Sequence, residues 1–283
     1  MEYRKLGRTE LNVSLISLGG AQLEAVNELQ AKQVIDKAIS LGMNFIDTAV
    51  KYKEEKLKLA LSTNKRKIIV ASKSTEPGKE EIIKNVKASV HKLGIRKIHL
   101  YQLHGVDDEG GLHYKLNHAL KGLKEMQKGK LIEWIGVHGQ NINVLKKAVK
   151  TEEFDTVMLP YNYAYDEAEE LIDIAYDRGV GIIVMEPFGR GLIVNPDRLN
   201  VDPKGEEKGF LNHETALKWI ISNKKISTVI PGGNKVEYVR KNASVMDKQY
   251  LFSREKRDTI HTAVKALVKN EYFRLCDNPW GGK

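Results

Sequence analysis

Eight short apolar segments alternate with amphipathic stretches along this chain, and the alternation restricts its fold more than any other feature. The apolar segments are rich in Val, Ile and Leu on both faces, which is typical of strands in a covered parallel sheet. The stretches between them have helical periodicity; residues 27–42, for example, begin with Asn and end on Gly. The expected strands are residues 15–20, 44–49, 67–73, 97–104, 131–138, 154–160, 180–188 and 226–233.

Eight strand–helix units without a linker or a change in composition predict an α/β fold, a (β/α)8 TIM barrel, as one domain over residues 1–283. Residues 2–14 are expected to form an N-terminal β-hairpin, and residues 253–270 an extra C-terminal helix followed by a tail. The alternative is a doubly wound open sheet. Its first strand normally leads into Gly-x-Gly-x-x-Gly, a spacing that "LGGAQLE" lacks.

Composition narrows the possible partners. No apolar run approaches the roughly 20 residues of a membrane span, and no signal-type stretch follows the N-terminus, so we expect a cytoplasmic protein. The single cysteine, Cys276, can form neither an intramolecular disulfide nor a four-cysteine site, so we expect no metal and no iron–sulfur cluster. The net charge of +9 is carried by lysines mixed with glutamates, as in residues 79–94, which favours solvated helix faces over a nucleic-acid partner.

Ionisable residues end three consecutive predicted strands. Asp47, Lys73 and His104 stand at the C-terminal tips of these strands, and Tyr52 lies in the loop after the first of them. In a (β/α)8 barrel this end of the strands carries the active site. Because a buried, unpaired carboxylate is costly, we expect Asp47 to pair with Lys73.

This arrangement predicts proton donation to a carbonyl. A free tyrosine has a pKa near 10, and a neighbouring ammonium lowers it, so Lys73 is expected to make Tyr52 a better acid. His104 is expected to donate a hydrogen bond to the carbonyl oxygen. Reduction of a carbonyl also requires a hydride, which no side chain supplies, so a nicotinamide cofactor is implied.

The motifs around these positions resemble those of the aldo-keto reductase family over roughly residues 3 to 245. They are "FIDTAVKY", "VASK", "LYQLHGVD", "IGVHG", "MEPFGRGL" and "STVIPGGNKVEYVRKN". The resemblance implies a (β/α)8 barrel and NAD(P)H-dependent reduction of a small aldehyde or ketone. It also implies a catalytic tetrad of Asp47, Tyr52, Lys73 and His104.

The positions that hold the nicotinamide depart from the family pattern. Where the family has a Ser-Asn pair and a Gln for the carboxamide, this chain has His138-Gly139 and Met158. Met185 stands where an aromatic residue often stacks on the ring, and a thioether stacks less directionally. The polar contacts are therefore expected from His138, backbone groups or Asn162. The alternative for His138 is a purely structural role.

The phosphates of the cofactor are expected at the start of the helix after the last strand, where backbone N–H groups suit an anion. Lys235 is expected to meet the adenosine 2′-phosphate, and Asn242 to lie near the adenine. Asn234 replaces an arginine common in the family, but Arg240 and Lys241 keep the region basic, which favours NADP(H) over NAD(H).

Residues 189–191 (Gly-Arg-Gly) are expected over the pyrophosphate, with Arg190 as a clamp. The cofactor contacts expected together are Gly20, His138, Asn162, Met185, Pro187, Gly189, Arg190, Gly191, Gly232, Gly233, Asn234, Lys235 and Asn242.

Two other functions stay open at this stage. One is a cofactor-binding regulatory or binding protein on the same fold with little turnover, and the other is a basic nucleic-acid-binding protein. Phe273 and Trp280 of the tail are expected either to cover the substrate or to pack on the surface. The substrate and the oligomeric state do not follow from the sequence.

Overall fold

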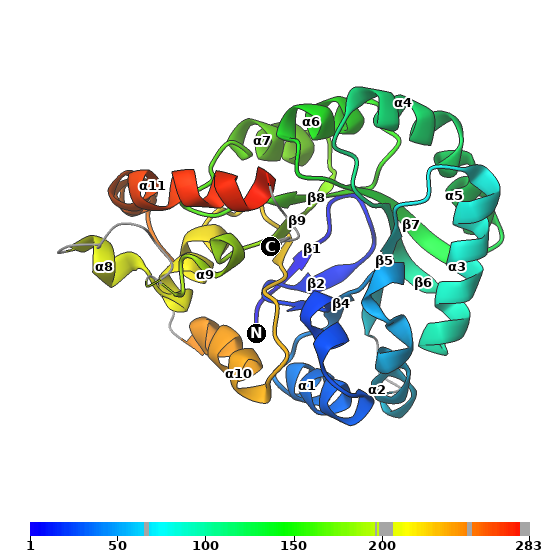
Figure 1. The fold of residues 1–283 in the computed structure, drawn as a ribbon, viewed down its shortest axis with the longest axis horizontal. Helices are drawn as coiled ribbons and strands as arrows, with labels where there is room; N and C mark the ends of the chain where they lie inside the picture. The colour runs from blue at the N-terminus through cyan, green and yellow to red at the C-terminus, as the bar shows by residue number, and fades with distance from the viewer. Residues whose placement is uncertain (65–67, 196, 198–205, 248–250, 278–283) are drawn as a thin grey trace.

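A ring of parallel strands surrounded by helices forms the centre of the structure (Figure 1). The computed structural model describes residues 1–64, 68–195, 197, 206–247 and 251–277, of which 206, 266 and 268–277 are described by their backbone only. The strands of the ring follow one another in chain order. They are β3 (Leu18–Gly19), β4 (Phe45–Asp47), β5 (Ile69–Ser74), β6 (Ile98–Leu103), β7 (Ile132–His138), β8 (Thr156–Pro160), β9 (Gly181–Met185) and β10 (Thr228–Val229).

The first and last segments of the ring are joined to each other. Ser17 N donates to Val229 O at 2.9 Å, and Gly19 N donates to Pro231 O at 3.0 Å. Parallel bridges pair Ile16 with Val229 and Gly19 with Gly232. The sheet therefore closes on itself, which confirms the predicted (β/α)8 barrel and rules out the doubly wound open sheet.

Each predicted strand overlaps an observed one, although most of the observed strands are shorter. The outer ring contains α1 (Glu28–Ser40), α2 (Lys58–Thr63), α3 (Lys79–Leu93), α4 (Glu109–Asn117), α5 (Ala119–Lys128), α6 (Ile142–Lys150), α7 (Glu169–Asp177), α8 (Glu206–Phe210), α9 (His213–Ile221) and α10 (Val236–Ser244). Short 3-10 turns are η1 (Ala21–Ala25), η2 (Val50–Tyr52), η3 (Glu54–Leu57), η4 (Gly189–Gly191) and η6 (Val245–Asp247).

The signals for helix starts and stops were correct at α1 and α3. Asn27 caps α1 in a reciprocal capping box with Gln30, and Gly94 ends α3 with φ +65°. Helix α7 begins at Glu169, three residues after Asp166. The carboxylate of Asp166 does not cap α7; it binds Lys265 at 3.0 Å.

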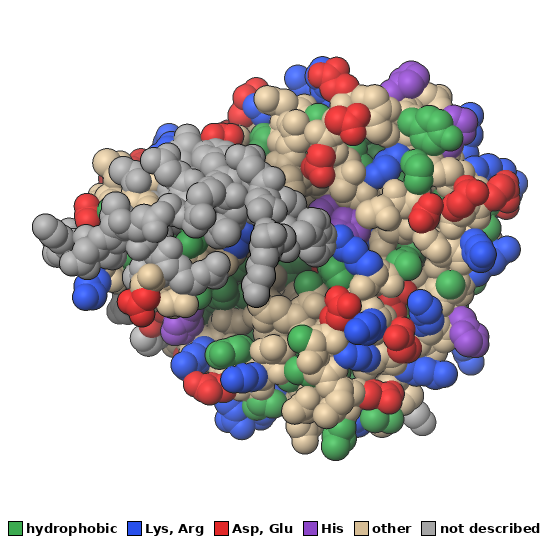
Figure 2. Space-filling view, viewed as in Figure 1, with side chains coloured by type: hydrophobic (Ala, Val, Ile, Leu, Met, Phe, Trp, Pro, Cys, Tyr) green, Lys and Arg blue, Asp and Glu red, His purple; other side chains and the backbone are tan. Residues whose placement is uncertain are grey.

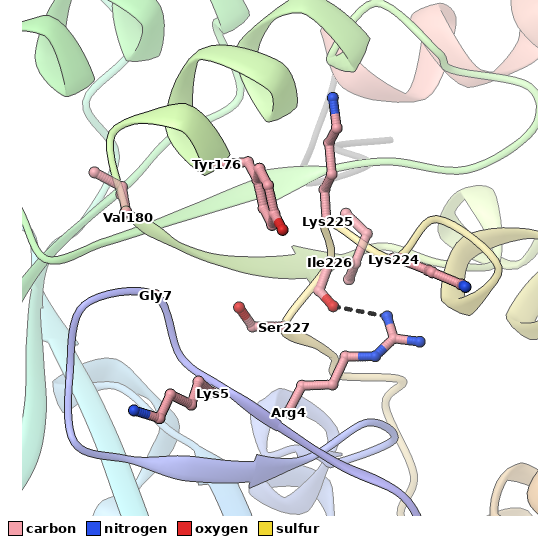
Figure 3. A pocket seen from close by; sticks show the side chains of 10 residues that line it. Arg4, Lys5, Gly7, Tyr176, Val180, Lys224, Lys225, Ile226 and Ser227 are labelled. Atoms are coloured by element: carbon pink, nitrogen blue, oxygen red, sulfur yellow. Dashed lines mark hydrogen bonds between the residues drawn. The ribbon is translucent and has the colours of Figure 1, made fainter.

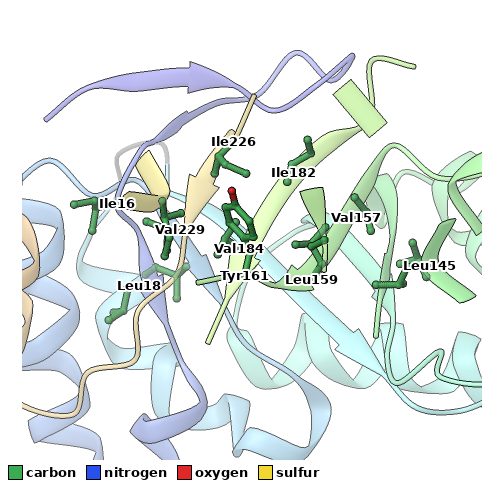
Figure 4. Packing of buried hydrophobic residues seen from close by; sticks show 14 of the residues in the cluster. Ile16, Leu18, Leu145, Val157, Leu159, Tyr161, Ile182, Val184, Ile226 and Val229 are labelled. Atoms are coloured by element: carbon green, nitrogen blue, oxygen red, sulfur yellow. The ribbon is translucent and has the colours of Figure 1, made fainter. Parts of the chain in front are cut away.

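Two separate apolar layers pack on the sheet. Alternate residues of the strands face the barrel interior, where Phe45, Ala71, Leu100 and Ile183 form one cluster. The intervening residues face the helices in the larger cluster. Figure 4 shows part of that outer layer, including Ile16, Leu145, Val157, Ile182, Val184 and Val229.

The predicted N-terminal hairpin is present as antiparallel β1 (Tyr3–Lys5) and β2 (Asn12–Ser14). It covers the N-terminal end of the barrel, since Leu6 and Val13 join the interior cluster. Gly7 has φ +59°, and a Cβ there would lie 2.1 Å from Gly181 N at the start of β9. Only glycine fits this close approach. The hairpin thus leaves the C-terminal end of the strands as the open end.

The predicted extra helix is α11 (Arg254–Asp277), which packs beside α9 and the loop after β8 (Figure 1). Trp219 Nε1 donates to Arg257 O at 2.9 Å, and the Arg257 guanidinium lies 4.4 Å from the Trp219 ring centre. Trp280, with the side chains of Phe273 and Cys276, lies outside the described residues, so the expectations for the tail stay predictions.

Surface charge follows the expected mixture. Figure 2 shows acidic and basic side chains interspersed over the face it presents. Pairs such as Lys79–Glu125 and Lys225–Asp173, at 3.0 and 2.8 Å, link lysines of the outer layer to neighbouring carboxylates. Within the described ranges, no helix has the length and apolar character needed to cross a bilayer.

Candidate active site

The carboxylate of Asp47 and the ammonium of Lys73 form a buried ion pair inside the barrel mouth. Lys73 Nζ lies 2.5 Å from Asp47 Oδ2 and also donates to Thr48 O at 3.0 Å. Strand pairing places them next to each other, because Asp47 ends β4 opposite Ala71 of β5 and Lys73 lies two residues further on the same face. The expected pairing is confirmed.

Burial governs the protonation of this pair. Both side chains are almost fully buried, and the second oxygen of Asp47 has no hydrogen-bond partner among the described residues. Burial raises the pKa of Asp47, and the Lys73 ammonium offsets part of that rise. The attraction between the two opposite charges thus offsets part of the cost of burying them.

Tyr52 lies beside this pair, at the end of η2. The Lys73 ammonium is 5.2 Å from the centre of the Tyr52 ring, and the ring centre of His104 is 6.3 Å away at an angle of 76°. Lys53, the next residue, adopts the left-handed conformation at φ 54° and turns the chain away from the mouth. Tyr52 and the three residues predicted at the strand ends are therefore brought together at one end of the barrel.

The expected effect of Lys73 on Tyr52 is not what the structure shows. The pKa of Tyr52 is raised, first by burial and then by the negative charges of Asp47, Glu186 and Glu24. The ammonium of Lys73 donates to Asp47 and Thr48 instead. Tyr52 thus keeps its proton at neutral pH in this state of the site.

His104 and His138 lie in contact and are both neutral at neutral pH. Their ring centres are 4.5 Å apart at 90°. Burial is the main cause that lowers the pKa of each ring; His138 adds to the effect on His104, and Lys73 adds to the effect on both. A neutral imidazole retains one N–H donor, so His104 can donate a hydrogen bond to a carbonyl oxygen.

Internal contacts define the tautomer of His138. Gly105 N–H donates to its Nδ1 at 3.3 Å, so the ring proton sits on Nε2. That Nε2 lies 3.1 Å from the sulfur of Met185. Both nitrogens are thus engaged within the protein, which favours the structural alternative for His138 over an anchor for the carboxamide.

Asn162, an expected cofactor contact, has hydrogen-bond partners for its side chain within the protein. Its side chain is fully buried. The amide oxygen accepts N–H groups from Ala164 and Tyr165, and the amide nitrogen donates to Glu186 O at 3.1 Å. Because these contacts form the turn after β8, the side chain is used locally. Met158 and Met185 are also buried and line the barrel interior.

The predicted phosphate region lies where β10 leads into α10. Gly20 N donates to Asp47 O at 2.8 Å, and Gly232 bridges to Gly19, so these backbones lie close to the tetrad. No side chain caps the N-terminus of α10, and Lys235, its exposed N-cap residue, lies 5.6 Å from the Tyr238 ring centre. The open N–H groups and this lysine suit an anion.

Two further predicted contacts are Asn242 and Arg190. Asn242 is buried on α10. Arg190 lies in the left-handed conformation within η4, and its Nε lies 3.1 Å from Glu186 Oε2. Gln140 Nε2 donates to the other oxygen of Glu186 at 3.0 Å. The guanidinium of Arg190 is therefore held at the mouth by Glu186.

The comparisons with known proteins agree with this geometry. The family model described as Aldo/keto reductase family matches residues 15–211. The chain belongs to the aldo/keto reductase family. The holo form of aldo-keto reductase AKR11C1 from Bacillus halodurans aligns with a TM-score of 0.83 and 25% identity, over 96% of this chain and 99% of that one.

Two relatives of this aldo/keto reductase are named as oxidoreductases or dehydrogenases. "Uncharacterized oxidoreductase YqkF" of Bacillus subtilis is 24% identical, over 90% of this chain and 94% of its own length. "L-galactose dehydrogenase" of Arabidopsis thaliana is 24% identical, over 87% and 88% respectively. The chain thus spans nearly the whole of each relative.

Three residues near the aldo/keto reductase tetrad were not singled out from the sequence. Lys115 of α4 donates to His104 O at 2.7 Å and to Gly105 O at 3.1 Å, which holds the end of β6. Glu186 connects Gln140 with Arg190, as described above, and Glu54 is buried behind the Tyr52 loop. Lys115 and Glu54 lie in mixed polar stretches without a distinguishing pattern, whereas Glu186 lies within the quoted motif "MEPFGRGL" but was given no role. Among the described residues, no cluster of His, Cys, Asp and Glu could hold a metal.

A cavity of about 340 Å³ lies at the opposite end of this aldo/keto reductase, between the hairpin and the starts of β9 and β10 (Figure 3). Arg4 on its wall donates to Ile221 O at 3.0 Å and to Ile226 O at 2.9 Å, so it holds the end of α9. Tyr176 and Ser227 also line it. The cavity is remote from the tetrad and belongs to the closed end of the barrel.

Proposed function

We propose that this aldo/keto reductase reduces aldehydes or ketones to alcohols with a nicotinamide cofactor, and that Tyr52 is the proton donor. The observation that carries the proposal is the Asp47–Lys73 pair at 2.5 Å, with the ammonium 5.2 Å from the Tyr52 ring centre. An acid beside a fixed cation can release a proton because the cation stabilises the resulting phenolate.

Each residue has a distinct role in this proposal. Tyr52 donates its proton to the carbonyl oxygen, while His104 hydrogen-bonds the same oxygen and orients it. Lys73 stabilises the negative charge left on Tyr52, and Asp47 holds Lys73 in place. The cofactor, when bound, supplies the hydride. The raised pKa of Tyr52 keeps the acid protonated until a carbonyl oxygen accepts the proton.

The proposed cofactor is NADP(H) rather than NAD(H). Lys235 at the open N-terminus of α10, with Arg240 and Lys241 on the same helix, makes this region basic. Gly20, Gly232 and Gly233 would let the cofactor approach the backbone. The remaining contacts proposed for its pyrophosphate and adenine sides are Pro187, Gly189, Arg190, Gly191, Asn234 and Asn242.

A screen of aldehydes and ketones with NADH and NADPH in parallel tests the proposal. We expect oxidation of NADPH at 340 nm with at least one small carbonyl compound, faster than that of NADH. Tight binding of either cofactor without turnover of any member of the panel would contradict it.

A second function, a cofactor-binding regulatory protein with little turnover, is supported by one observation. Two residues expected near the carboxamide, His138 and Asn162, use their side chains within the protein. A loosely held nicotinamide would slow hydride transfer. The rate of a single turnover, with enzyme in excess over the best carbonyl compound, separates the two functions.

A further inference from the structure

Glu54 is a carboxylic acid buried behind the Tyr52 loop, in the layer between the sheet and the helices. Its residue is 0% exposed, and one carboxyl oxygen accepts a hydrogen bond from Ser72 Oγ at 2.5 Å. The other oxygen has no hydrogen-bond partner among the described residues. The proposed mechanism does not use this group, although it stands two residues after Tyr52.

The position of Glu54 connects it to the tetrad through β5. Ser72 and Lys73 are neighbours on that strand, so their side chains point to opposite faces of the sheet. Lys73 meets Asp47 inside the barrel, and Ser72 meets Glu54 outside it. The loop is thus attached to one strand on both faces.

The backbone between Tyr52 and Glu54 has one unusual conformation. Lys53 has φ 54° and ψ 59°, which non-glycine residues rarely adopt. This residue turns the chain from Tyr52 in the mouth to Glu54 in the outer layer. Such a conformation persists only where the surrounding contacts determine it. Two side-chain contacts meet this turn: the hydrogen bond from Ser72 to Glu54, and an exposed ion pair between Lys53 and Glu24 at 3.7 Å.

The surroundings raise the pKa of Glu54. Burial is the main cause that raises its pKa; the hydroxyls of Ser72 and Ser89 and the charge of Lys92 oppose the rise, and Glu55 adds to it. The amide of glutamine has nearly the shape of the carboxyl group and keeps an oxygen that can accept the hydrogen bond of Ser72. Glutamine is therefore the matched replacement.

We propose that Glu54 is a positioning residue: by accepting the hydrogen bond of Ser72, it holds the loop that places Tyr52 against Lys73. Its effect on catalysis rests on the proposed function, whereas its effect on the loop does not. Removing the contact should release the loop and misplace the hydroxyl of Tyr52. A misplacement of about 1 Å can lower a rate roughly 100-fold.

The test uses four variants. Glu54→Ala, Ser72→Ala and the double variant that combines these two changes remove the contact, and Glu54→Gln is the matched control. Hydrogen exchange of the peptide covering residues 48–57 reports on the loop, and kcat and KM for 4-nitrobenzaldehyde with NADPH report on Tyr52. We expect faster exchange and roughly 10- to 100-fold lower kcat in both single alanine variants. KM should stay near that of the wild type. The double variant should be no worse than either single one, because both remove the same contact.

Two comparisons separate positioning from a general loss of stability. Glu54→Gln should retain most of the activity and the slow exchange of the wild type. Thr9→Val removes another buried hydroxyl, at the hairpin end of the barrel, and should leave the loop and kcat unchanged. If Glu54→Ala does not fold, Ser72→Ala and Glu54→Gln still decide the question.

The inference is overturned if loop exchange in Ser72→Ala matches the wild type, or if Glu54→Gln loses activity as fully as Glu54→Ala. It is also overturned if the two alanine changes are additive. A wild type that turns over no carbonyl compound would contradict the proposed function alone, because hydrogen exchange still tests the contact between Glu54 and Ser72.

Discussion

The ammonium group of Lys73 lies 5.2 Å from the centre of the Tyr52 ring but donates its hydrogen bonds to Asp47 and Thr48. The position of Lys73 therefore has to be considered separately for the phenolate that forms in the reaction and for the pKa of Tyr52 before the reaction. The cation is close enough to stabilise a phenolate, yet burial still raises the pKa of Tyr52. The site therefore stores the proton on Tyr52 and, on the proposed mechanism, releases it only to a substrate oxygen.

Replacing Tyr52 with Phe should abolish carbonyl reduction and leave cofactor binding nearly intact, because it removes only the phenolic proton. General acids typically contribute about 100- to 10,000-fold, so kcat should fall by at least that order. Steady-state rates and cofactor titration by fluorescence measure the two effects. Tyr114→Phe, at an exposed tyrosine of α4, is the matched control. Wild-type turnover in Tyr52→Phe would reject Tyr52 as the acid.

The ion pair allows stability and catalysis to be separated. Lys73→Met alone leaves a buried carboxylate unpaired and should cost about 3–5 kcal/mol, and adding Asp47→Asn should restore much of that. Turnover should not return in the double variant, because no cation remains to stabilise the phenolate. The melting temperature and the reduction rate are measured for the wild type, Lys73→Met, Asp47→Asn and the double variant. Joint recovery of both quantities would make Lys73 a structural counter-ion only.

Lys235→Ala should weaken NADPH binding far more than NADH binding if its ammonium meets the 2′-phosphate. A hydrogen bond to a charged group contributes about 1.5–3 kcal/mol, which corresponds to roughly 10- to 150-fold in Kd. Isothermal titration with both cofactors measures the ratio. Lys225→Ala removes the same charge at the other end of the barrel and serves as the control. Equal losses for the two cofactors would transfer the role to Arg240 or Lys241.

Acid should destabilise the fold through the interior histidines. The folded state lowers the pKa of His138, so below about pH 6.5 the unfolded chain binds a proton that the folded chain does not. The free energy of unfolding should then fall by up to about 1.4 kcal/mol per pH unit for this residue, and His138→Asn should reduce that slope. Urea unfolding between pH 5 and 8 measures it. Identical slopes below pH 6.5 would contradict a neutral His138.

Local pattern was sufficient for the architecture and the tetrad. Apolar runs between amphipathic stretches predicted each strand, and parallel strands bring their C-terminal ends to one edge, so Asp47, Lys73 and His104 had to meet there. The cap of α1 at Asn27 was likewise readable, since its partner Gln30 lies three residues away. In these cases the interacting groups are set by sequence spacing or by the geometry of the sheet.

Contacts between segments far apart in the sequence decided the hydrogen-bond partners of His138 and the pKa of Tyr52. The sequence could not show that His138 is held by Gly105 and Met185, because these lie 33 and 47 residues away from it. The raised pKa of Tyr52 depends on burial, which exists only once the barrel has closed. The chain by itself determined which residues stand at the mouth. Only the tertiary structure decided which of their atoms already have a partner, since hydrogen bonds and desolvation depend on neighbours in space.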